Sequence, residues 1–216
     1  MKLLILGGFL GSGKTSLLMQ LAHYMTDTSG GTALYRVVIL ENEVGREGVD
    51  DRLLKSSGYN VENLFAGCAC CTVGGELVTA VSAIEKDYGP DWMILETTGL
   101  AYPGLIRDNL CHALGKESRI CTVTDASRWA RIKIPMAELL AGQISCADTV
   151  LINKADLAGE ETLEGMEADI REMNPAAGVR RVSALEEIPT EIWDRVLGRT
   201  DHGTEENAPD GGGPYG

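Results

Sequence analysis

The first chemistry visible in the sequence lies near the start of the chain, in an eight-residue segment typical of a phosphate-binding loop. Residues Gly8–Thr15 read GFLGSGKT and match the pattern G-x-x-x-x-G-K-[ST] in full. In such a loop the backbone N–H groups turn inward onto phosphate oxygens, the lysine reaches the β- and γ-phosphates, and the final hydroxyl binds Mg²⁺. The predicted contacts are Gly8, Gly11, Ser12, Gly13, Lys14, Thr15 and Ser16.

The neighbouring residues decide between a functional loop and a glycine-rich turn that matches by chance. An apolar run of strand type, Leu3–Leu6, precedes the loop, and a helix-like stretch, Lys14–Met25, follows it. A strand, a glycine-rich turn and a helix in this order are the context that phosphate binding requires, because the helix N-terminus adds its dipole. The context therefore favours the functional interpretation.

A second motif, Asn153-Lys154-Ala155-Asp156, predicts which base is bound. It directly follows the apolar run Thr149–Ile152. The carboxylate of Asp156 can accept hydrogen bonds from N1–H and the N2 amine of guanine, a donor pair that adenine lacks. Lys154 is expected to lay its stem along the base and Asn153 to brace neighbouring loops. The alternative is a polar turn without a ligand.

A third short segment supports guanine over that alternative and over adenine. Ser183 and Ala184 follow an apolar run that ends at Val182, one strand further along the chain. There the backbone N–H of Ala184 would lie near guanine O6.

Carboxylates follow two other apolar runs. Glu96 ends the run Trp92–Leu95, where the hydration shell of Mg²⁺ needs an acceptor, and Gly99 can offer its N–H to a γ-phosphate. A glutamate that merely caps the next element is the alternative. Glu41 and Glu43 follow the run Arg36–Leu40 and can contact Mg²⁺, a transition metal or only water.

Asp125 ends a further run, and for this residue we favour a cap on the helix that follows over a ligand contact.

Three cysteines within four residues, Cys68, Cys70 and Cys71, are typical of a thiolate metal site. Soft thiolates suit Zn²⁺ and also bind Co²⁺ or Ni²⁺. A fourth ligand would come from Glu41, Glu43, a histidine or a second subunit. A redox dithiol and inert buried cysteines are the alternatives.

The elements that must position these residues follow from hydrophobic periodicity. Apolar runs with few polar positions indicate strands buried on both faces, and helix-like stretches alternate with them. This order predicts a doubly wound α/β fold, a mostly parallel sheet with helices on both faces. The predicted strands are Leu3–Leu6, Arg36–Leu40, Trp92–Leu95, Ile120–Val123 and Thr149–Ile152. The predicted helices are Lys14–Met25, Asp50–Ser57, Gly75–Tyr88, Leu105–Leu114, Glu160–Met173 and Pro189–Val196.

Length and composition limit the number of domains and the classes of partner. The 216 residues suffice for one domain over 1–198, followed by a Gly-, Pro- and acid-rich tail over 199–216 that is expected to be disordered. A net charge of −13 disfavours binding to nucleic acid. No apolar run approaches the length of a membrane span, so we expect a cytoplasmic protein without membrane contact.

The motifs GFLGSGKTS, ENEVG, GCACC, ETTGLA, NKAD and SAL, in this order, resemble the CobW/HypB/UreG family of GTPases. The likeness covers residue 1 to about residue 197 and is greatest to the CobW-type metallochaperones. It implies a P-loop NTPase fold of the SIMIBI class. It also implies GTP and Mg²⁺ as ligands, with catalytic contacts from Lys14, Thr15, Glu96 and Gly99 and with Glu96 reaching the magnesium through water.

The resemblance further implies slow GTP hydrolysis coupled to zinc, cobalt or nickel at Cys68, Cys70 and Cys71. The expected partners are a client metalloenzyme or cofactor-assembly protein and a nucleotide- or metal-dependent second copy of the chain. CobW-type proteins usually carry a C-terminal domain and often a histidine-rich segment, and this sequence has neither; Arg46 stands where the family often has an acid. The alternatives are a GTPase switch that gates cofactor loading without delivering metal, and a small-molecule kinase.

Overall fold

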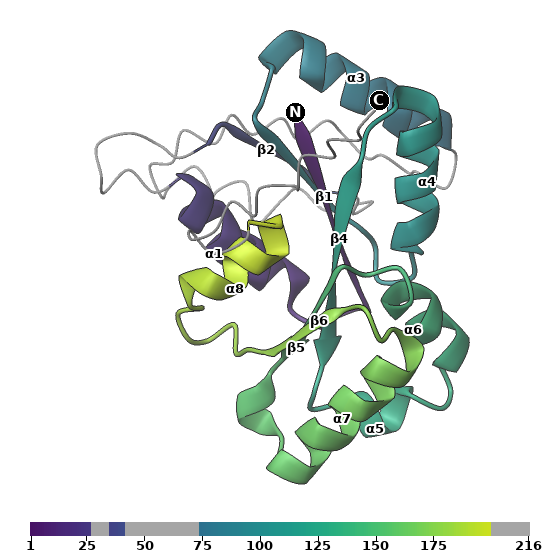
Figure 1. The fold of residues 1–216 in the computed structure, drawn as a ribbon, viewed down its shortest axis with the longest axis vertical. Helices are drawn as coiled ribbons and strands as arrows, with labels where there is room; N and C mark the ends of the chain where they lie inside the picture. The colour runs from purple at the N-terminus through teal and green to yellow at the C-terminus, as the bar shows by residue number, and fades with distance from the viewer. Residues whose placement is uncertain (27–34, 42–73, 200–216) are drawn as a thin grey trace, which may run out of the picture.

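Strands and helices alternate along the chain in the computed structural model, which describes residues 1–26, 35–41 and 74–199 (Figure 1). The strands are β1 (Lys2–Gly8), β2 (Val37–Glu41), β3 (Trp92–Glu96), β4 (Ser118–Asp125), β5 (Thr149–Asn153) and β6 (Gly178–Arg181). The helices are α1 (Lys14–Thr26), α3 (Gly74–Tyr88), α4 (Pro103–Leu114), α5 (Trp129–Ile132), α6 (Ala137–Ile144), α7 (Glu160–Met173) and α8 (Thr190–Leu197), with the 3-10 turn η1 (Ala155–Leu157).

The strands form a six-stranded sheet in the order β2-β3-β1-β4-β5-β6. Every neighbouring pair in this sheet is parallel. β1 lies between β3 and β4, and the chain builds the sheet first to one side of β1 and then to the other. In a parallel sheet this reversal opens a crevice at the carboxyl ends of the strands, beside β1.

Helices cover both faces of the sheet, which explains why the strands read as continuous apolar runs. Successive residues of a strand point to opposite faces, so Leu3 and Ile5 of β1 pack with α3, α4, α6 and α7, whereas Leu4 and Leu6 pack with α1 and α8. Figure 1 shows α3, α4, α6 and α7 on one side of the sheet and α1 and α8 on the other. The predicted doubly wound α/β fold is therefore confirmed.

Two helices were missing from the prediction, and two predicted segments fall outside the described residues. The structure adds α5 and α6 between β4 and β5. The predicted helix Asp50–Ser57 and the residues after 199 lie outside the described ranges, so the domain limit at 198 and the disordered tail stay predictions. Among the described residues, no helix has both the length and the apolar character that a membrane crossing requires.

Candidate functional site

Four of the sequence motifs meet at one edge of the sheet. β1, β3, β4 and β5 all end there, and they end at Gly8, Glu96, Asp125 and Asn153 respectively. Because the strands are parallel and adjacent, segments far apart in the sequence are brought together around the loop between β1 and α1. This edge is the crevice at which α/β proteins of this topology bind their ligands.

The loop Gly8–Thr15 has the backbone of an anion-binding turn. Gly8, Gly11 and Gly13 have φ angles of 133°, 70° and 95°, which side-chain-bearing residues rarely adopt. The Lys14 ammonium is buried and donates to the carbonyls of Gly8 at 3.0 Å and Phe9 at 3.5 Å, so it lies within the curl of the loop. The loop thus has the conformation that the sequence motif predicts.

Ser12 adds an independent sign that the loop is built for a polar ligand. Its side chain is completely buried, and its Oγ atom has no hydrogen-bond partner among the described residues. A buried hydroxyl without a partner is unfavourable, and phosphate oxygens at this position would accept its hydrogen bond.

Thr15 and Glu96, the two predicted magnesium residues, lie in direct contact. The Thr15 hydroxyl, at the start of α1, donates to Glu96 Oε1 at 2.9 Å, and Glu96 is almost fully buried at the end of β3. The two residues are 81 positions apart in sequence. A hydroxyl and a carboxylate beside a phosphate loop are hard oxygen ligands, so these residues fit Mg²⁺ and its hydration shell.

Gly99 lies directly against the phosphate loop. A Cβ atom on Gly99 would be 2.5 Å from the backbone nitrogen and 2.8 Å from the Cα of Leu10. No larger residue fits without a shift of one backbone or the other. The segment that follows β3 therefore packs directly against the phosphate loop. From this position a backbone N–H can contact a γ-phosphate.

Asn153 joins the phosphate loop to the loop after β6. Its Nδ2 atom donates to the Ser12 carbonyl at 2.8 Å, and its Oδ1 atom accepts from the Ala184 N–H at 2.9 Å. A Cβ on Gly13 would approach Asn153 Nδ2 to 2.2 Å, so the bracing contact also requires glycine there. The Ala184 N–H, which we expected at guanine O6, is thus engaged with Asn153, and its contact to guanine stays a prediction.

Of the other residues in the predicted guanine segments, Lys154 also contacts the phosphate loop. Lys154 has a left-handed backbone (φ 59°), and its Nζ atom donates to the Gly11 carbonyl at 2.9 Å. Its stem therefore runs from the end of β5 to the phosphate loop. Asp156 is exposed in η1, and Ser183 is buried with its hydroxyl accepting from the Leu185 N–H at 3.3 Å.

The prediction that Asp125 caps a helix is wrong. Helix α5 begins only at Trp129, and its N-terminus has no side-chain cap. The helix starts too far along the chain for such a cap, so the carboxylate accepts instead from the N–H of Ser127 at 3.0 Å and from its hydroxyl at 2.6 Å. Asp125 also binds Lys154 Nζ at 2.7 Å, and its own side chain is completely buried. Asp125 therefore fixes the position of Lys154, the lysine of the predicted guanine motif.

Arg128 is a site residue that the sequence analysis did not identify. Its Nε atom pairs with Asp125 at 2.7 Å, and its Nη2 atom donates to the Leu10 carbonyl at 2.7 Å. Its guanidinium also lies 6.0 Å from the centre of the Phe9 ring. Arg128 and Lys154 therefore hold adjacent carbonyls of the phosphate loop, and the same buried carboxylate holds them both.

The Asp125 carboxyl makes the stability of this site depend on pH. Burial raises its pKa, but the hydrogen bonds from Lys154, Ser127 and Arg128 lower it by more, so the pKa lies below the ordinary value of 3.8. A carboxyl whose pKa is lowered by folding stabilises the folded protein above its ordinary pKa. This contribution is lost as the pH falls through the folded-state value.

The variant Asp125→Asn is accordingly expected to be less stable than the wild type at pH 7 and to lose less further stability between about pH 5 and pH 3. Urea unfolding at a series of pH values measures both effects. Asp169→Asn is the control, because the pKa of Asp169 is also lowered but its partners, Trp129 and Lys133, lie away from the phosphate loop. If stability depends on pH in Asp125→Asn as it does in the wild type, the Asp125 carboxylate has no electrostatic role.

The predicted transition-metal ligands mostly lie outside the described residues. Glu43, Cys68, Cys70 and Cys71 belong to the range 42–73, and Glu41 ends β2 in register with Glu96 of β3. Within 1–26, 35–41 and 74–199, no group of three metal-binding side chains occurs. The thiolate site therefore stays a prediction.

Two cysteines outside the predicted metal cluster, Cys121 and Cys146, lie in packed positions. Cys121 is buried in β4, where desolvation raises its pKa to about 12, and Cys146 is half-buried beside β5. Both thiols thus remain protonated and unreactive near neutral pH.

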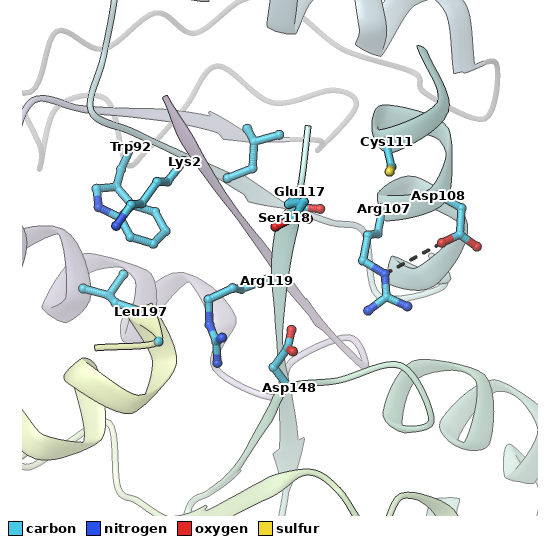
Figure 2. A pocket seen from close by; sticks show the side chains of 12 residues that line it. Lys2, Trp92, Arg107, Asp108, Cys111, Glu117, Ser118, Arg119, Asp148 and Leu197 are labelled. Atoms are coloured by element: carbon cyan, nitrogen blue, oxygen red, sulfur yellow. Dashed lines mark ion pairs between the residues drawn. The ribbon is translucent and has the colours of Figure 1, made fainter. Parts of the chain in front are cut away.

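A cavity of about 550 Å³ lies at the opposite edge of the sheet (Figure 2). Residues at the starts of the strands line it, among them Lys2, Trp92 and Ser118. Its charged lining residues balance in sign: Lys2, Arg107, Arg119, Asp108, Glu117 and Asp148. The nucleotide motifs follow the other ends of the strands, so this cavity is not the nucleotide site.

The fold and the arrangement around Gly8–Thr15 define a P-loop NTPase fold: a parallel sheet, a phosphate-loop motif after β1 and a helix that starts at its end. Comparison with known proteins agrees with this class. Residues 2–181 match the nucleotide-binding domain of the family CobW/HypB/UreG, so the chain belongs to this family.

The similar proteins include relatives in bacteria and fungi. Zinc chaperone YjiA of Escherichia coli (strain K12) is 33% identical over 167 residues, which cover 72% of this chain and 50% of that protein. Zinc-regulated GTPase metalloprotein activator 1 of Schizosaccharomyces pombe is 34% identical over 187 residues, covering 81% and 44%. The chain thus spans about half the length of the curated relatives it matches.

A solved structure shows the same fold. The hydrogenase maturation factor HypB of Archaeoglobus fulgidus superposes with a TM-score of 0.64 at 19% identity, over 91% of this chain and 88% of that one.

Proposed function

We propose that this chain binds GTP with Mg²⁺ on Gly8–Thr15 and hydrolyses it slowly, as one part of a metallochaperone cycle. The observation that carries the nucleotide part is the Thr15–Glu96 contact of 2.9 Å at the mouth of the phosphate loop. The buried Ser12 hydroxyl, which has no partner within the described part of the chain, and the buried Lys14 ammonium supply a donor and a positive charge for phosphate oxygens.

Each residue has a definable part in the reaction. Lys14 places its charge on the β- and γ-phosphates, where negative charge builds up in phosphoryl transfer. Thr15 offers its hydroxyl oxygen to the magnesium, and Glu96 orders the water around it. When bound, Mg²⁺ would supply positive charge that offsets the negative charge on the β- and γ-phosphate oxygens, including the charge that develops on GDP as it leaves. Gly99 offers its N–H to the γ-phosphate and is released when that phosphate departs.

Guanine selection is assigned to Asp156, with Asn153 and Lys154 holding the motif against the phosphate loop. The position supports this, because the Lys154 stem already bridges the end of β5 and Gly11. Asp156 is exposed, so its carboxylate is free to accept the N1–H and N2 amine of a guanine base.

Asp156→Asn tests this assignment by inverting part of the hydrogen-bond pattern. The amide offers a donor to the carbonyl that xanthine carries at position 2, so affinity for a GTP analogue should fall about a hundredfold and affinity for the xanthine analogue should rise. Calorimetric titration with both analogues measures the change. Asp108→Asn, an exposed aspartate at the opposite edge, should change neither affinity. Equal loss of both nucleotides in Asp156→Asn would mean that the side chain does not read the base.

The second part of the proposal concerns metal. Two similar proteins are named a zinc chaperone and a zinc-regulated GTPase metalloprotein activator. On this basis we assign Zn²⁺, with Co²⁺ or Ni²⁺ as alternative cargo, to Cys68, Cys70 and Cys71, with Glu41 and Glu43 as further ligands. Thiolates favour these soft and borderline ions over Mg²⁺. The receiving partner is a client metalloenzyme or cofactor-assembly protein, and a second copy of the chain can join in a nucleotide-dependent dimer.

Coupling between nucleotide and metal is the testable core of this part. If Zn²⁺ binds one nucleotide state more tightly, the nucleotide affinities must change by the same factor. Zinc titration against a competing chelator, with a non-hydrolysable GTP analogue or GDP bound, should give two different zinc affinities. Cys70→Ser should weaken zinc binding in both states. Identical zinc affinities, with unchanged GTPase activity in Cys70→Ser, would instead support a GTPase that gates cofactor loading without carrying metal.

A further inference from the structure

A buried glutamine on α6 holds the segment that follows Glu96. Gln143 is 1% exposed, and its Nε2 atom donates to two carbonyls of this segment, Gly99 at 3.1 Å and Ala101 at 3.0 Å. These contacts join α6, which the sequence analysis missed, to the part of the chain that lies against the phosphate loop. The residue lies outside every motif discussed above.

The orientation of the Gln143 amide follows from its neighbours. Both carbonyls need a donor, so the NH₂ group must face them, because the reverse orientation would put three oxygens together. Its Oε1 atom is buried and has no donor among the described residues. A buried acceptor without a partner is costly, and the hydrogen bonds from the NH₂ group must offset this cost.

The rest of α6 anchors this contact firmly. The Gln143 carbonyl accepts from the Thr122 hydroxyl of β4 at 2.8 Å, which ties the residue to the centre of the sheet. The adjacent Gly142 receives the Tyr102 ring so closely that a Cβ there would be 2.4 Å from a ring carbon. The segment 99–102 therefore rests on two consecutive residues of α6.

The opposite side of the same segment touches the phosphate loop. Gly99 packs on the Leu10 backbone, and the Gln143 bond acts on the carbonyl of that same glycine. Whatever fixes this carbonyl also fixes how closely Gly99 approaches Leu10. A donor held in place before the ligand arrives contributes more to recognition than one that must be ordered on binding.

We propose that Gln143 is a positioning residue for γ-phosphate recognition. It holds Gly99 against the phosphate loop, so that the chain distinguishes GTP from GDP. The inference rests on the proposed contact between the Gly99 N–H and the γ-phosphate. Gln143 itself touches no nucleotide and acts only through the backbone of residues 99–101.

The test compares Mg²⁺–GDP with the magnesium complex of a non-hydrolysable GTP analogue. Gln143→Met keeps the length of the side chain and removes its donor, so affinity for the GTP analogue should fall about tenfold while affinity for GDP stays unchanged. Gln143→Glu, which puts an oxygen where the NH₂ group stood, should give the same shift. Calorimetry on each variant, with circular dichroism to confirm folding, gives the ratio of the two affinities.

Gln20 provides a matched control. Its Nε2 atom likewise donates to two carbonyls, Ala184 at 2.9 Å and Glu186 at 3.0 Å, on the guanine side of the site. Gln20→Met should weaken both nucleotides together and leave their ratio unchanged, because its contacts hold the base loop rather than Gly99.

Gly99→Ala separates the possible failures. If Gly99→Ala loses the discrimination and Gln143→Met retains it, the γ-phosphate contact stands and the role of Gln143 is wrong. If neither variant changes the ratio of GTP-analogue affinity to GDP affinity, both the Gly99 contact with the γ-phosphate and the positioning role of Gln143 are refuted. Equal weakening of both nucleotides in Gln143→Met would reduce Gln143 to a packing residue.

Discussion

Replacing Lys14 with methionine is expected to lower the rate of GTP hydrolysis by a factor of about 10² to 10³ and to weaken GTP binding strongly. The ammonium is buried in the curl of the phosphate loop, against the Gly8 and Phe9 carbonyls. Methionine keeps most of the stem and removes the charge, so the loss reports on the phosphate contact. Phosphate release under single-turnover conditions and calorimetric titration measure the two effects.

Lys133→Met is the appropriate comparison. Lys133 is a half-exposed lysine whose partner is Asp169, away from the phosphate loop. Its loss should leave hydrolysis within twofold of the wild type, since exposed ion pairs contribute about 0–1 kcal/mol to stability and nothing to this site. Hydrolysis by Lys14→Met at the wild-type rate would mean that Gly8–Thr15 is not the phosphate site.

The second large effect is expected for Asn153→Ala, which removes the brace between the phosphate loop and the loop after β6. Asn153 is 1% exposed, and its removal leaves the Ser12 carbonyl and the Ala184 N–H without their partner. Each such group costs about 1–3 kcal/mol, so the free energy of unfolding should fall by about 2–6 kcal/mol. GTP and GDP affinities should fall together, because both loops contact parts that the two nucleotides share.

Asn174→Ala distinguishes the local effect from general destabilisation. Asn174 is similarly buried and donates to the carbonyls of Ile144 at 2.8 Å and Ala147 at 2.9 Å, away from the phosphate loop. Its removal should lower the stability by a similar amount and leave nucleotide affinity unchanged at temperatures where the variant is folded. Urea unfolding measures the stability of both variants, and calorimetry measures their nucleotide affinity. Wild-type affinity in Asn153→Ala would refute the bracing role.

Most of the fold could be predicted because its elements are long or strongly apolar. The predicted helix Glu160–Met173 has the bounds of α7, since its apolar residues recur at helical spacing between polar ones. Helix α6 was missed because its eight residues, AELLAGQI, are short, apolar on most sides and interrupted by Gly142. Such a run cannot be assigned to a helix or a strand from periodicity alone.

The candidate site likewise contains residues that sequence could predict and residues that it could not. The phosphate loop and the guanine motif are contiguous in sequence, so their residue types and spacing reveal them. Asp125, Arg128 and Gln143 act through contacts with residues far away in the chain, such as Lys154, Leu10 and Gly99. These partners depend on how the strands are ordered in the sheet. Local sequence signalled only that Asp125 ends a strand, and nothing in it pointed to Arg128 or Gln143.

Calorimetric titration of the wild-type chain with a non-hydrolysable GTP analogue, with and without Mg²⁺, tests whether the loop Gly8–Thr15 binds GTP with magnesium. We predict binding of one nucleotide per chain that strengthens when magnesium is added and that an ATP analogue does not reproduce. Absence of heat with both guanine and adenine nucleotides, even with magnesium in excess, would contradict the assignment of the Thr15–Glu96 pair and of the loop around it.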